Sequence, residues 1–316
     1  MQYQGWESYW QSGNRDQALI ADANVQSFID QYWVLQLQAA IHGHTIGTAL
    51  ELGCGAGSLA PTIKHYLHGS VVGPLTVYLD ISHSALARLN TVHASAALVQ
   101  ADMARLPFRN DSIDLILSQF GIEYAGTQAF CDSAGLLTSN GILIALCHHQ
   151  DGCLVDRAKQ AQRLLTEIVS CGMLPAAHFA LTTLFDCIEG RQAHARFVEA
   201  DTLLSPKVQA VGLLVRQHSH ERLVIPWLSK FCRDFAAIYH HPQNYPRSAS
   251  MVWLDNMIRE LPAYLDRMQQ LITASLSNTC IELIQSRLGQ AGFAFQAEPL
   301  SVKGQLFAWS LRILRL

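Results

Sequence analysis

The feature that most constrains this fold is a glycine-rich stretch, residues 49–61, with the sequence ALELGCGAGSLAP. Its apolar start predicts a buried strand, its alternating glycines a tight turn, and its end a helix that begins near Ser58. Glycine takes positive φ at no steric cost and lets a ligand approach the backbone closely. Pro61 fits the first turn of the helix, where the N–H that it lacks would have no partner. The stretch therefore predicts a strand, a turn and a helix that can hold a ligand against the backbone.

The spacing of the glycines narrows the class of ligand. The pattern Glu51-x-Gly53-x-Gly55-x-Gly57 differs from the G-x-G-x-x-G of dinucleotide-binding folds, which disfavours a nicotinamide dehydrogenase. After a strand, this pattern resembles the first motif of class I S-adenosylmethionine-dependent methyltransferases. An ordinary tight turn between a strand and a helix is the alternative. The resemblance implies that the backbone around the glycines holds the amino-acid end of the cofactor.

Acidic residues follow the next two predicted strands. Leu75–Asp80 reads as an apolar strand ending in an acid, and Asp102 comes shortly after a strand over residues 96–100. A carboxylate accepts from two hydroxyls at once, so Asp80 stands where a ribose diol would be bound, unless it is a plain strand-end acid. The family resemblance implies that Asp80 binds the ribose hydroxyls, that Asp102 accepts from the adenine amino group and that Met103 packs near the ring.

Two further stretches carry the same resemblance. Residues 102–108 match the family pattern D-x-x-x-L-P-F, and residues 111–118 match its DxSFDLV strand. Four motifs in this order and at the distances usual in the family argue against a chance match. The resemblance implies S-adenosyl-L-methionine as the cofactor and S-adenosyl-L-homocysteine as its product. The predicted cofactor-binding residues are Glu51, Gly53, Cys54, Gly55, Gly57, Asp80, Ile81, Asp102, Met103 and Ser118.

The candidate catalytic residues follow two later strands. His148 and His149 come directly after a predicted strand over residues 142–147, at the edge of the sheet where ligands of open α/β folds lie. Neighbouring side chains alternate in an extended segment, so at most one histidine faces the cleft. Histidine is the commonest general base, although a loop histidine satisfied by backbone is the simpler interpretation. Glu123 is the second candidate for the base. For Tyr124 the same two interpretations apply, a functional role or a side chain satisfied within the fold.

The segment around Glu123 also bears on the acceptor. Residues 119–124, QFGIEY, contain neither the Asn/Asp-Pro-Pro-Tyr/Phe motif of the methylases of amino groups in nucleic acids nor the Pro-Cys nucleophile of cytosine C5 methylases. A net charge of −3 and a pI of about 6.5 give no basic footprint for nucleic acid. We therefore expect a small-molecule methyl acceptor with an oxygen or nitrogen nucleophile. An RNA or nucleotide methyltransferase and a non-catalytic cofactor-binding subunit remain alternatives.

The strand and helix pattern predicts the fold class and domains. A Rossmann-like, seven-stranded, mostly parallel sheet with an antiparallel last strand is expected over residues 46–149 and 278–316, with an Asn140-Gly141 turn before the fifth strand. Between them, residues 150–277 read as a helical insertion that stops at Gly172, breaks between residues 203 and 207 and between residues 260 and 262, and is punctuated by Pro242 and Pro246. It forms a substrate cap or else an oligomerisation or stabilising element.

The N-terminal segment and the composition complete the predictions. Residues 1–45 read as helical, with Trp6, Tyr9 and Trp10 on one face, either stapled to the core or forming a flap over the cofactor cleft. Half of the 316 residues are apolar and 15% are charged, which permits an ample core and a homodimer. The absence of a signal segment or membrane span, and of C-x-x-C among eight cysteines, predicts a cytoplasmic protein with reduced thiols. The histidines lack companion ligands at familiar spacings, so no metal is expected.

Overall fold

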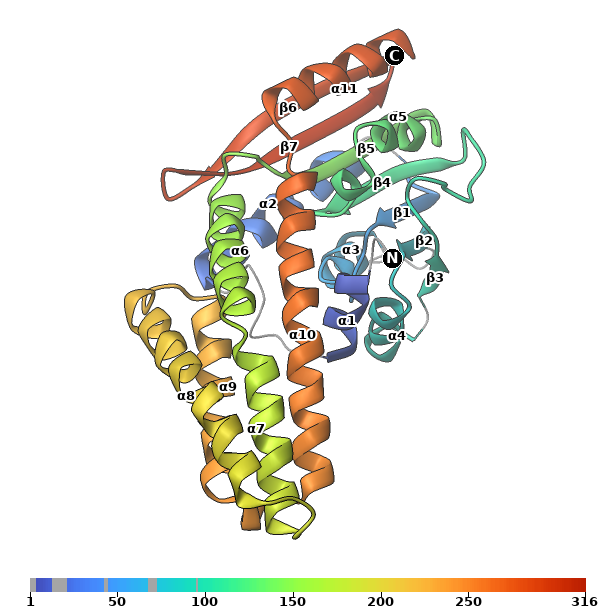
Figure 1. Cartoon of the computed structure of the whole chain (residues 1–316). Coiled ribbons are helices and arrows are strands. Elements are labelled where there is room, and N and C mark those ends of the chain that lie inside the picture. The colour runs from blue at the N-terminus through green and yellow to red at the C-terminus, as the bar shows by residue number, and fades with distance from the viewer. Residues whose placement is uncertain (1–3, 13–21, 43–44, 68–72, 95) are drawn as a thin grey trace. The chain divides into compact units, whose positions relative to one another are not determined.

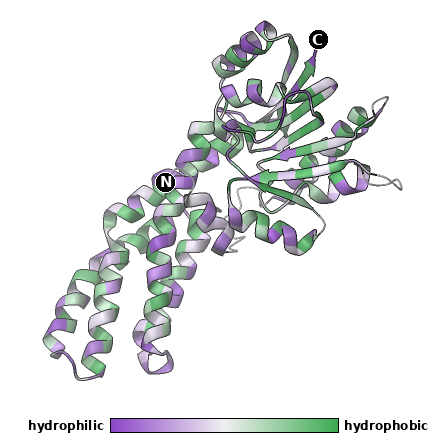
Figure 2. Ribbon diagram, turned by 90° about the vertical axis from the view of Figure 1, so that its right-hand side faces the viewer, coloured by the Kyte–Doolittle hydropathy of each residue, from purple (hydrophilic) through white to green (hydrophobic). Residues whose placement is uncertain are grey.

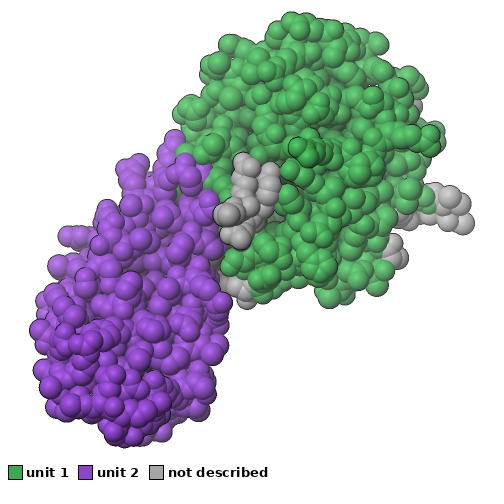
Figure 3. Space-filling view, turned by 45° about the vertical axis from the view of Figure 1, so that its right-hand side comes forward, with its two compact units in different colours: residues 1–13, 20–158, 270–316 green, residues 14–19, 159–269 purple. Residues whose placement is uncertain are grey.

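The computed structural model describes residues 4–12, 22–42, 45–67, 73–94 and 96–316. The chain divides into two compact units (Figures 1 and 3). The first comprises the described residues up to 158 together with residues 270–316, and the second comprises residues 159–269. Both boundaries fall inside helices, α6 (Cys153–Cys171) and α10 (Arg247–Ala274).

The first unit contains a seven-stranded sheet in the order β3-β2-β1-β4-β5-β7-β6, counted over its described residues. Strands β1 to β5 pair in parallel, whereas β7 is antiparallel to both β5 and β6. This topology confirms the predicted Rossmann-like fold with an antiparallel last strand. The strands are β1 (Thr48–Leu52), β2 (Leu75–Asp80), β3 (Ala97–Gln100), β4 (Ile113–Gln119), β5 (Leu137–His148), β6 (Phe293–Val302) and β7 (Gln305–Arg315).

Helices cover both faces of the sheet because its central strands are apolar on both sides, as their colour in Figure 2 shows. One face packs against α2 (Ala23–Ile41), α3 (Ala60–Leu67) and α4 (His83–Val92). The other packs against α5 (Gln128–Ala134) and α11 (Asn278–Gln290). The described N-terminal residues form α1 (Gln4–Ser12) and α2, and the part of the predicted helical segment over residues 13–21 lies outside the described residues.

The junction between β2 and α4 follows the local rules of the sequence. Strand β2 spans Leu75–Asp80 as predicted. Ser82 caps α4, because its hydroxyl accepts the backbone N–H of Ala85 at 3.1 Å. This tight junction fixes Asp80 at the carboxyl edge of the sheet, immediately before a helix N-terminus.

The predicted Asn140-Gly141 turn is wrong, because both residues lie inside the long strand β5. The pairing of β4 with β5 jumps from Ile113↔Leu137 to Leu115↔Ile142, so residues 138–141 form an irregularity within the strand. A Cβ on Gly141 would lie 2.9 Å from the carbonyl oxygen of Ile113. Glycine is needed there for the close approach of a neighbouring strand rather than for a turn.

The described residues of the second unit form helices joined by short loops. Its helices are the parts of α6 and α10 inside the unit, α7 (Met173–Ile188), α8 (His194–Gln217), α9 (Val224–His240) and the short η3 (Pro242–Asn244). The predicted stop at Gly172 is confirmed, since this residue separates α6 from α7 with φ 65°.

The predicted breaks between residues 203 and 207 and between residues 260 and 262 are wrong, because α8 continues through Pro206 and α10 continues through Pro262. A proline inside a helix removes one backbone hydrogen bond and kinks the helix, at a cost of about 3 kcal/mol. Burial of apolar neighbours on both sides opposes that cost: Leu204 and Val211 flank Pro206, and Leu261 and Tyr264 flank Pro262. Tertiary packing therefore overrides the local signal.

Among the described residues, no single helix is both long and apolar enough to cross a membrane. The bent pair α6 and α7, at 43°, passes the same test of length and composition when taken together.

Candidate functional site

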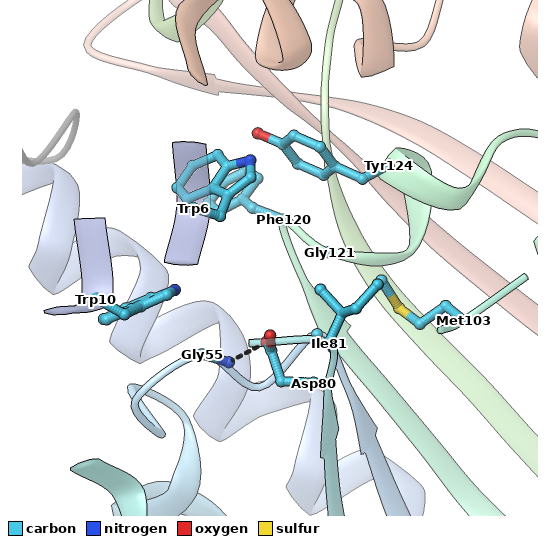
Figure 4. A pocket seen from close by; sticks show the side chains of 10 residues that line it. Trp6, Trp10, Gly55, Asp80, Ile81, Met103, Phe120, Gly121 and Tyr124 are labelled. Atoms are coloured by element: carbon cyan, nitrogen blue, oxygen red, sulfur yellow. Dashed lines mark hydrogen bonds between the residues drawn. The ribbon is translucent and has the colours of Figure 1, made fainter. Parts of the chain in front are cut away.

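A pocket of about 110 Å³ opens in the first unit where β1, β2 and β4 end (Figure 4). The carboxyl edge of a parallel sheet is where open α/β folds bind ligands. Five of the pocket residues come from the predicted cofactor set and five do not. The lining residues are Trp6, Trp10, Gly53, Gly55, Asp80, Ile81, Met103, Phe120, Gly121 and Tyr124.

The glycine turn after β1 forms one side of the pocket. Gly53 and Gly55 have φ values of 66° and 53°, a region that glycine alone occupies without strain. A Cβ on Gly53 would lie 2.9 Å from the Cα of Gly121. The backbones that follow β1 and β4 therefore touch, and side chains at either position would push the two strand ends apart.

Asp80 is held by the same turn. Its Oδ2 accepts the backbone N–H of Gly55 at 2.8 Å and its Oδ1 accepts that of Ser82 at 2.8 Å. Burial raises the pKa of Asp80, and these backbone hydrogen bonds act in the opposite direction. An ionised carboxylate has about four acceptor positions, so the group keeps capacity for hydroxyls of a ligand.

The remaining predicted cofactor residues lie next to the pocket rather than in its lining. Asp102 precedes the lining residue Met103 and accepts the backbone N–H of Ala104 at 2.9 Å. Ser118 is structural in its contacts: its hydroxyl donates to the carbonyl of Leu52 and accepts the N–H of Ile122, both at 2.9 Å.

Two residues of the glycine motif are buried beneath the turn. Cys54 is buried, and its pKa is raised by burial, which keeps the thiol protonated. Gly57 donates its N–H to the carbonyl of Cys54 at 2.9 Å. Both residues belong to the turn and are joined by this hydrogen bond, and neither lines the pocket.

Glu51 is an unusual member of the motif, because the carboxylate is 2% exposed. Burial, with a smaller contribution from the charge of Asp80, raises the pKa of Glu51 to about 8. Its Oε2 has no hydrogen-bond partner within the part of the chain that the structure describes. A buried polar atom without a partner is costly, so this atom indicates a site that a polar ligand or water would complete.

Four aromatic side chains form the other side of the pocket, and we call Trp6, Trp10, Phe120 and Tyr124 the aromatic wall. In Figure 4 the rings of Trp6, Phe120 and Tyr124 lie together, with Trp6 and Tyr124 edge to face at a centroid distance of 5.6 Å. Phe120 has φ 52°, a strained value for a bulky residue.

Sequence reasoning grouped Trp6 and Trp10 on one helical face but did not place Phe120 or Gly121 in the site. The available signal was the position of both residues directly after a buried strand. The structure favours the flap interpretation of α1 over a purely structural staple, since Trp6 and Trp10 line the pocket.

The proposed base residues form a buried pair behind the aromatic wall. The Nδ1 of His148 lies 2.8 Å from Oε1 of Glu123, and the same oxygen accepts the backbone N–H of His148 at 3.0 Å. The imidazole packs against Phe120, with ring centroids 4.5 Å apart, and edge to face against Tyr124 at 6.1 Å. His148 thus contacts two lining residues without itself lining the pocket.

His149 has a different environment. Its ring stacks on Trp309 at a centroid distance of 4.6 Å, and its Nδ1 accepts the backbone N–H of Asp151 at 3.0 Å. Burial lowers the pKa of His149. These contacts satisfy the side chain from within the fold, which is what alternation along an extended segment predicts for one of two neighbouring histidines. Among the described residues, no three His, Cys, Asp or Glu side chains are grouped to hold a metal ion.

The sequence match and the topology define the class of this unit. Residues 50–145 match a family model described as a methyltransferase domain. Together with the strand order, this match makes the core a class I S-adenosylmethionine-dependent methyltransferase domain, and S-adenosylmethionine is the cofactor that it implies. The spare acceptor capacity of Asp80, the glycines of the turn at Gly53 and Gly55, and the Glu51 oxygen without a hydrogen-bond partner among the described residues fit such a ligand.

Several solved structures resemble parts of the chain. YcgJ from Bacillus subtilis is 18% identical over 43% of this chain and 59% of its own, with a TM-score of 0.35. An S-adenosylmethionine-dependent methyltransferase from Mesorhizobium loti is 23% identical over 37% of this chain and 53% of its own, with a TM-score of 0.31. A putative methyltransferase from Methanococcus maripaludis is 14% identical over 90% of this chain and 84% of its own, with a TM-score of 0.40.

This chain thus spans less than two thirds of the first two of these proteins. With TM-scores below 0.5, these likenesses carry no argument about its activity. No curated protein sequence matches the chain.

Proposed function

We propose that this protein transfers the methyl group of S-adenosylmethionine to an oxygen or nitrogen of a small molecule. The observation that carries the proposal is the convergence of Gly53, Gly55 and Asp80 on one pocket at the carboxyl edge of a methyltransferase sheet. When bound, the cofactor supplies a methyl group already activated by its sulfonium. The residues of this chain then have to bind the cofactor and the methyl acceptor, align the two and exclude water from the site.

In the proposed binding mode, Asp80 accepts from the ribose hydroxyls with the oxygen positions that Gly55 and Ser82 leave free. The backbone of the glycine turn holds the amino-acid end, and Glu51 completes its hydrogen bonding there or through water. Met103 packs against the adenine, with Asp102 beside it. Alignment of two reactants in this way supplies roughly 7–11 kcal/mol in favourable cases.

For proton removal we propose His148, oriented by Glu123. A carboxylate on Nδ1 leaves Nε2 as the nitrogen that can accept a proton. A general base contributes about 10²–10⁴-fold to the rate when the acceptor carries a proton that must leave. The contacts of the imidazole with Phe120 and Tyr124 support this role, because they connect it to the pocket lining.

The helical residues 150–277 are proposed to select the acceptor. The support is their place in the chain, since α6 begins five residues after His148 ends β5, at the edge where the pocket lies. A crystal structure with S-adenosylhomocysteine and an identified acceptor tests this cap. The cap is excluded if the acceptor contacts the first unit alone.

The cofactor assignment is tested by calorimetry with S-adenosylhomocysteine. Asp80→Ala removes charged hydrogen bonds, each worth about 1.5–3 kcal/mol, so we expect affinity to fall at least tenfold. Asp132→Ala, a change to an exposed acid on α5, is the matched control and should bind as the parent protein does. Equal affinities for all three proteins would remove Asp80 from the site.

Acceptor specificity is tested with radiolabelled S-adenosylmethionine and a panel of hydroxyl and amine compounds, with RNA included. Transfer to a small molecule supports the proposal, and transfer to RNA alone contradicts it. Binding of the cofactor without transfer to any acceptor would point to a non-catalytic subunit.

A further inference from the structure

One carboxylate joins α1 to the rest of the methyltransferase core. The Oε2 of Glu7 accepts the hydroxyl of Ser82 at 2.6 Å, and its Oε1 accepts the hydroxyl of Ser84 at 2.5 Å. The backbone N–H of Ser84 also points to this carboxylate, at 3.4 Å. Both serines begin α4, and the N-terminus of a helix carries partial positive charge that favours an anion.

The electrostatics of Glu7 agree with a formed contact. Partial burial acts to raise its pKa, but the hydrogen bonds from Ser82 and Ser84 outweigh this and lower the pKa below the usual value. The side chain is therefore ionised near neutral pH, when its hydrogen bonds are charge-assisted.

The same helix supplies two residues of the aromatic wall. Trp6 and Trp10 lie on either side of Glu7 along α1. The contact of Glu7 with the start of α4 therefore holds the helix that carries both indoles. The Cζ2 of Trp10 lies 2.8 Å from where a Cβ on Gly55 would stand, and Trp6 meets Tyr124 edge to face. Figure 4 shows both indoles over the pocket, opposite Met103 and Ile81.

With α1 in this position the pocket is small. Its volume of about 110 Å³ is well below the roughly 300–1,000 Å³ of sites for drug-sized ligands and cofactors. The indole of Trp10, which packs against Gly55, also covers the backbone proposed for the amino-acid end of the cofactor. A cofactor can therefore reach the backbone of the glycine turn only when α1 moves away from it.

We propose that Glu7 is a positioning residue that latches α1 over the cofactor pocket, and that cofactor binding requires its contact with Ser82 and Ser84 to break. This inference rests on the proposed function, because it takes the pocket to be the S-adenosylmethionine site. Ser82 joins the latch to the site, since it contacts Glu7 through its hydroxyl and Asp80 through its backbone N–H.

A latch has a kinetic signature that an ordinary stabilising contact lacks. If the cofactor binds only while α1 is detached, a weaker latch raises the fraction of binding-competent protein and with it the association rate constant. The dissociation rate constant stays the same, so the dissociation constant falls by the same factor. Loss of a merely structural contact would instead weaken binding through faster dissociation alone.

The test is stopped-flow tryptophan fluorescence of the full chain with S-adenosylhomocysteine. Glu7→Gln keeps the shape of the side chain and removes its charge, and Ser84→Ala removes one donor without touching the cap of α4 by Ser82. We expect the association rate constant to rise about ten- to hundredfold in Glu7→Gln, the range for loss of a charged hydrogen bond, and less in Ser84→Ala, with the dissociation rate constant unchanged in both. Because the hydroxyl acts through the carboxylate, Ser84→Ala should have a smaller effect in the Glu7→Gln background than in the parent protein.

Two variants serve as controls for charge and hydroxyl loss. Asp30→Asn on α2 and Thr91→Ala on α4 change exposed residues outside the latch, and their rate constants should equal those of the parent protein. Unchanged rates in Glu7→Gln, or faster dissociation with no change in association, would overturn the latch while leaving the cofactor site intact. No binding by the parent protein would overturn both the latch and the proposed function.

Discussion

The Nδ1 of His148 lies 2.8 Å from the carboxylate of Glu123, and both side chains are buried. Glu123 also accepts the backbone N–H of His148, so one oxygen fixes both the ring and the strand end that carries it. Such a pair holds an imidazole in one tautomer with little freedom to rotate. This geometry suits a base that must stay aimed at an acceptor.

The first prediction concerns this pair. His148→Ala should lower the turnover of an identified acceptor by about 10²–10⁴-fold, the contribution of a general base. The dissociation constant of S-adenosylhomocysteine should stay the same, because His148 does not line the pocket. Initial-rate kinetics and calorimetry measure the two quantities. Full turnover in the variant would remove the base assignment.

Glu123→Gln distinguishes two effects of Glu123 on His148, the orientation of the ring and the stabilisation of its protonated form by the negative charge. The amide can still accept from the backbone of His148 but no longer stabilises a protonated ring, so we expect a smaller loss of turnover than in His148→Ala. His149→Gln is the control, since that histidine stacks on Trp309 away from Glu123. A loss in the control as large as that in His148→Ala would transfer the role to His149.

The second prediction concerns Glu51 and pH. Burial raises its pKa from 4.5 to about 8, so the folded protein keeps a proton that the unfolded chain releases. Its contribution to stability is complete below pH 4.5, declines as pH rises and is lost above pH 8. Glu51→Gln cannot release this proton, so its melting temperature should exceed that of the parent protein at pH 8 and approach it at pH 5. Parallel melting curves across this range would contradict the buried, protonated state.

The third prediction concerns the contact between the backbones after β1 and β4. A Cβ on Gly121 would lie 2.9 Å from the carbonyl oxygen of Leu52 and 3.1 Å from the Cα of Gly53. Gly121→Ala should therefore cost about 1–3 kcal/mol of unfolding free energy and weaken cofactor binding. Denaturant unfolding measures the first effect. Gly135→Ala, where the nearest atom would be 3.5 Å away, should cost little.

The fourth prediction uses two similar helix caps. Ser82 caps α4 and Ser277 caps α11, each accepting a backbone N–H at 3.1 Å. Either serine changed to alanine should lower stability by about 0.5–2 kcal/mol. Only Ser82→Ala should also speed cofactor association, because of these two serines only Ser82 contacts Glu7. Equal association rates in the two variants would show that Ser82 acts only as a cap.

The parts of the fold that local chemistry dictates were predicted well. Strand β2 has the predicted bounds, because an apolar run followed by an acid leaves few alternatives. The seven-stranded sheet with its antiparallel last strand agrees with the fold that the sequence predicts. Where tertiary packing decides, prediction failed: α8 and α10 pass through prolines, and Asn140-Gly141 sits inside a strand.

The site divides in the same way. Gly53, Gly55, Asp80, Ile81 and Met103 belong to short motifs, and the structure brings them to one pocket. The position of Phe120 and Gly121 directly after a buried strand was a sequence signal, but their approach to Gly53 depends on contacts between strands distant in sequence. Nothing in the sequence of residues 4–12 indicates that Glu7 contacts Ser82. Pairwise geometry of this kind depends on the assembled sheet, which no local pattern encodes.

The pairing of β7 with β5 has a consequence for synthesis on the ribosome. Ile142 pairs with Leu314, so the partner of β5 is translated only after the whole helical segment between them. Until then a nascent β5, apolar on both faces, presents an unpaired edge of the kind that invites aggregation. Early folding of the second unit would not cover that edge, so we expect aggregation during synthesis to be opposed only once β7 has been made.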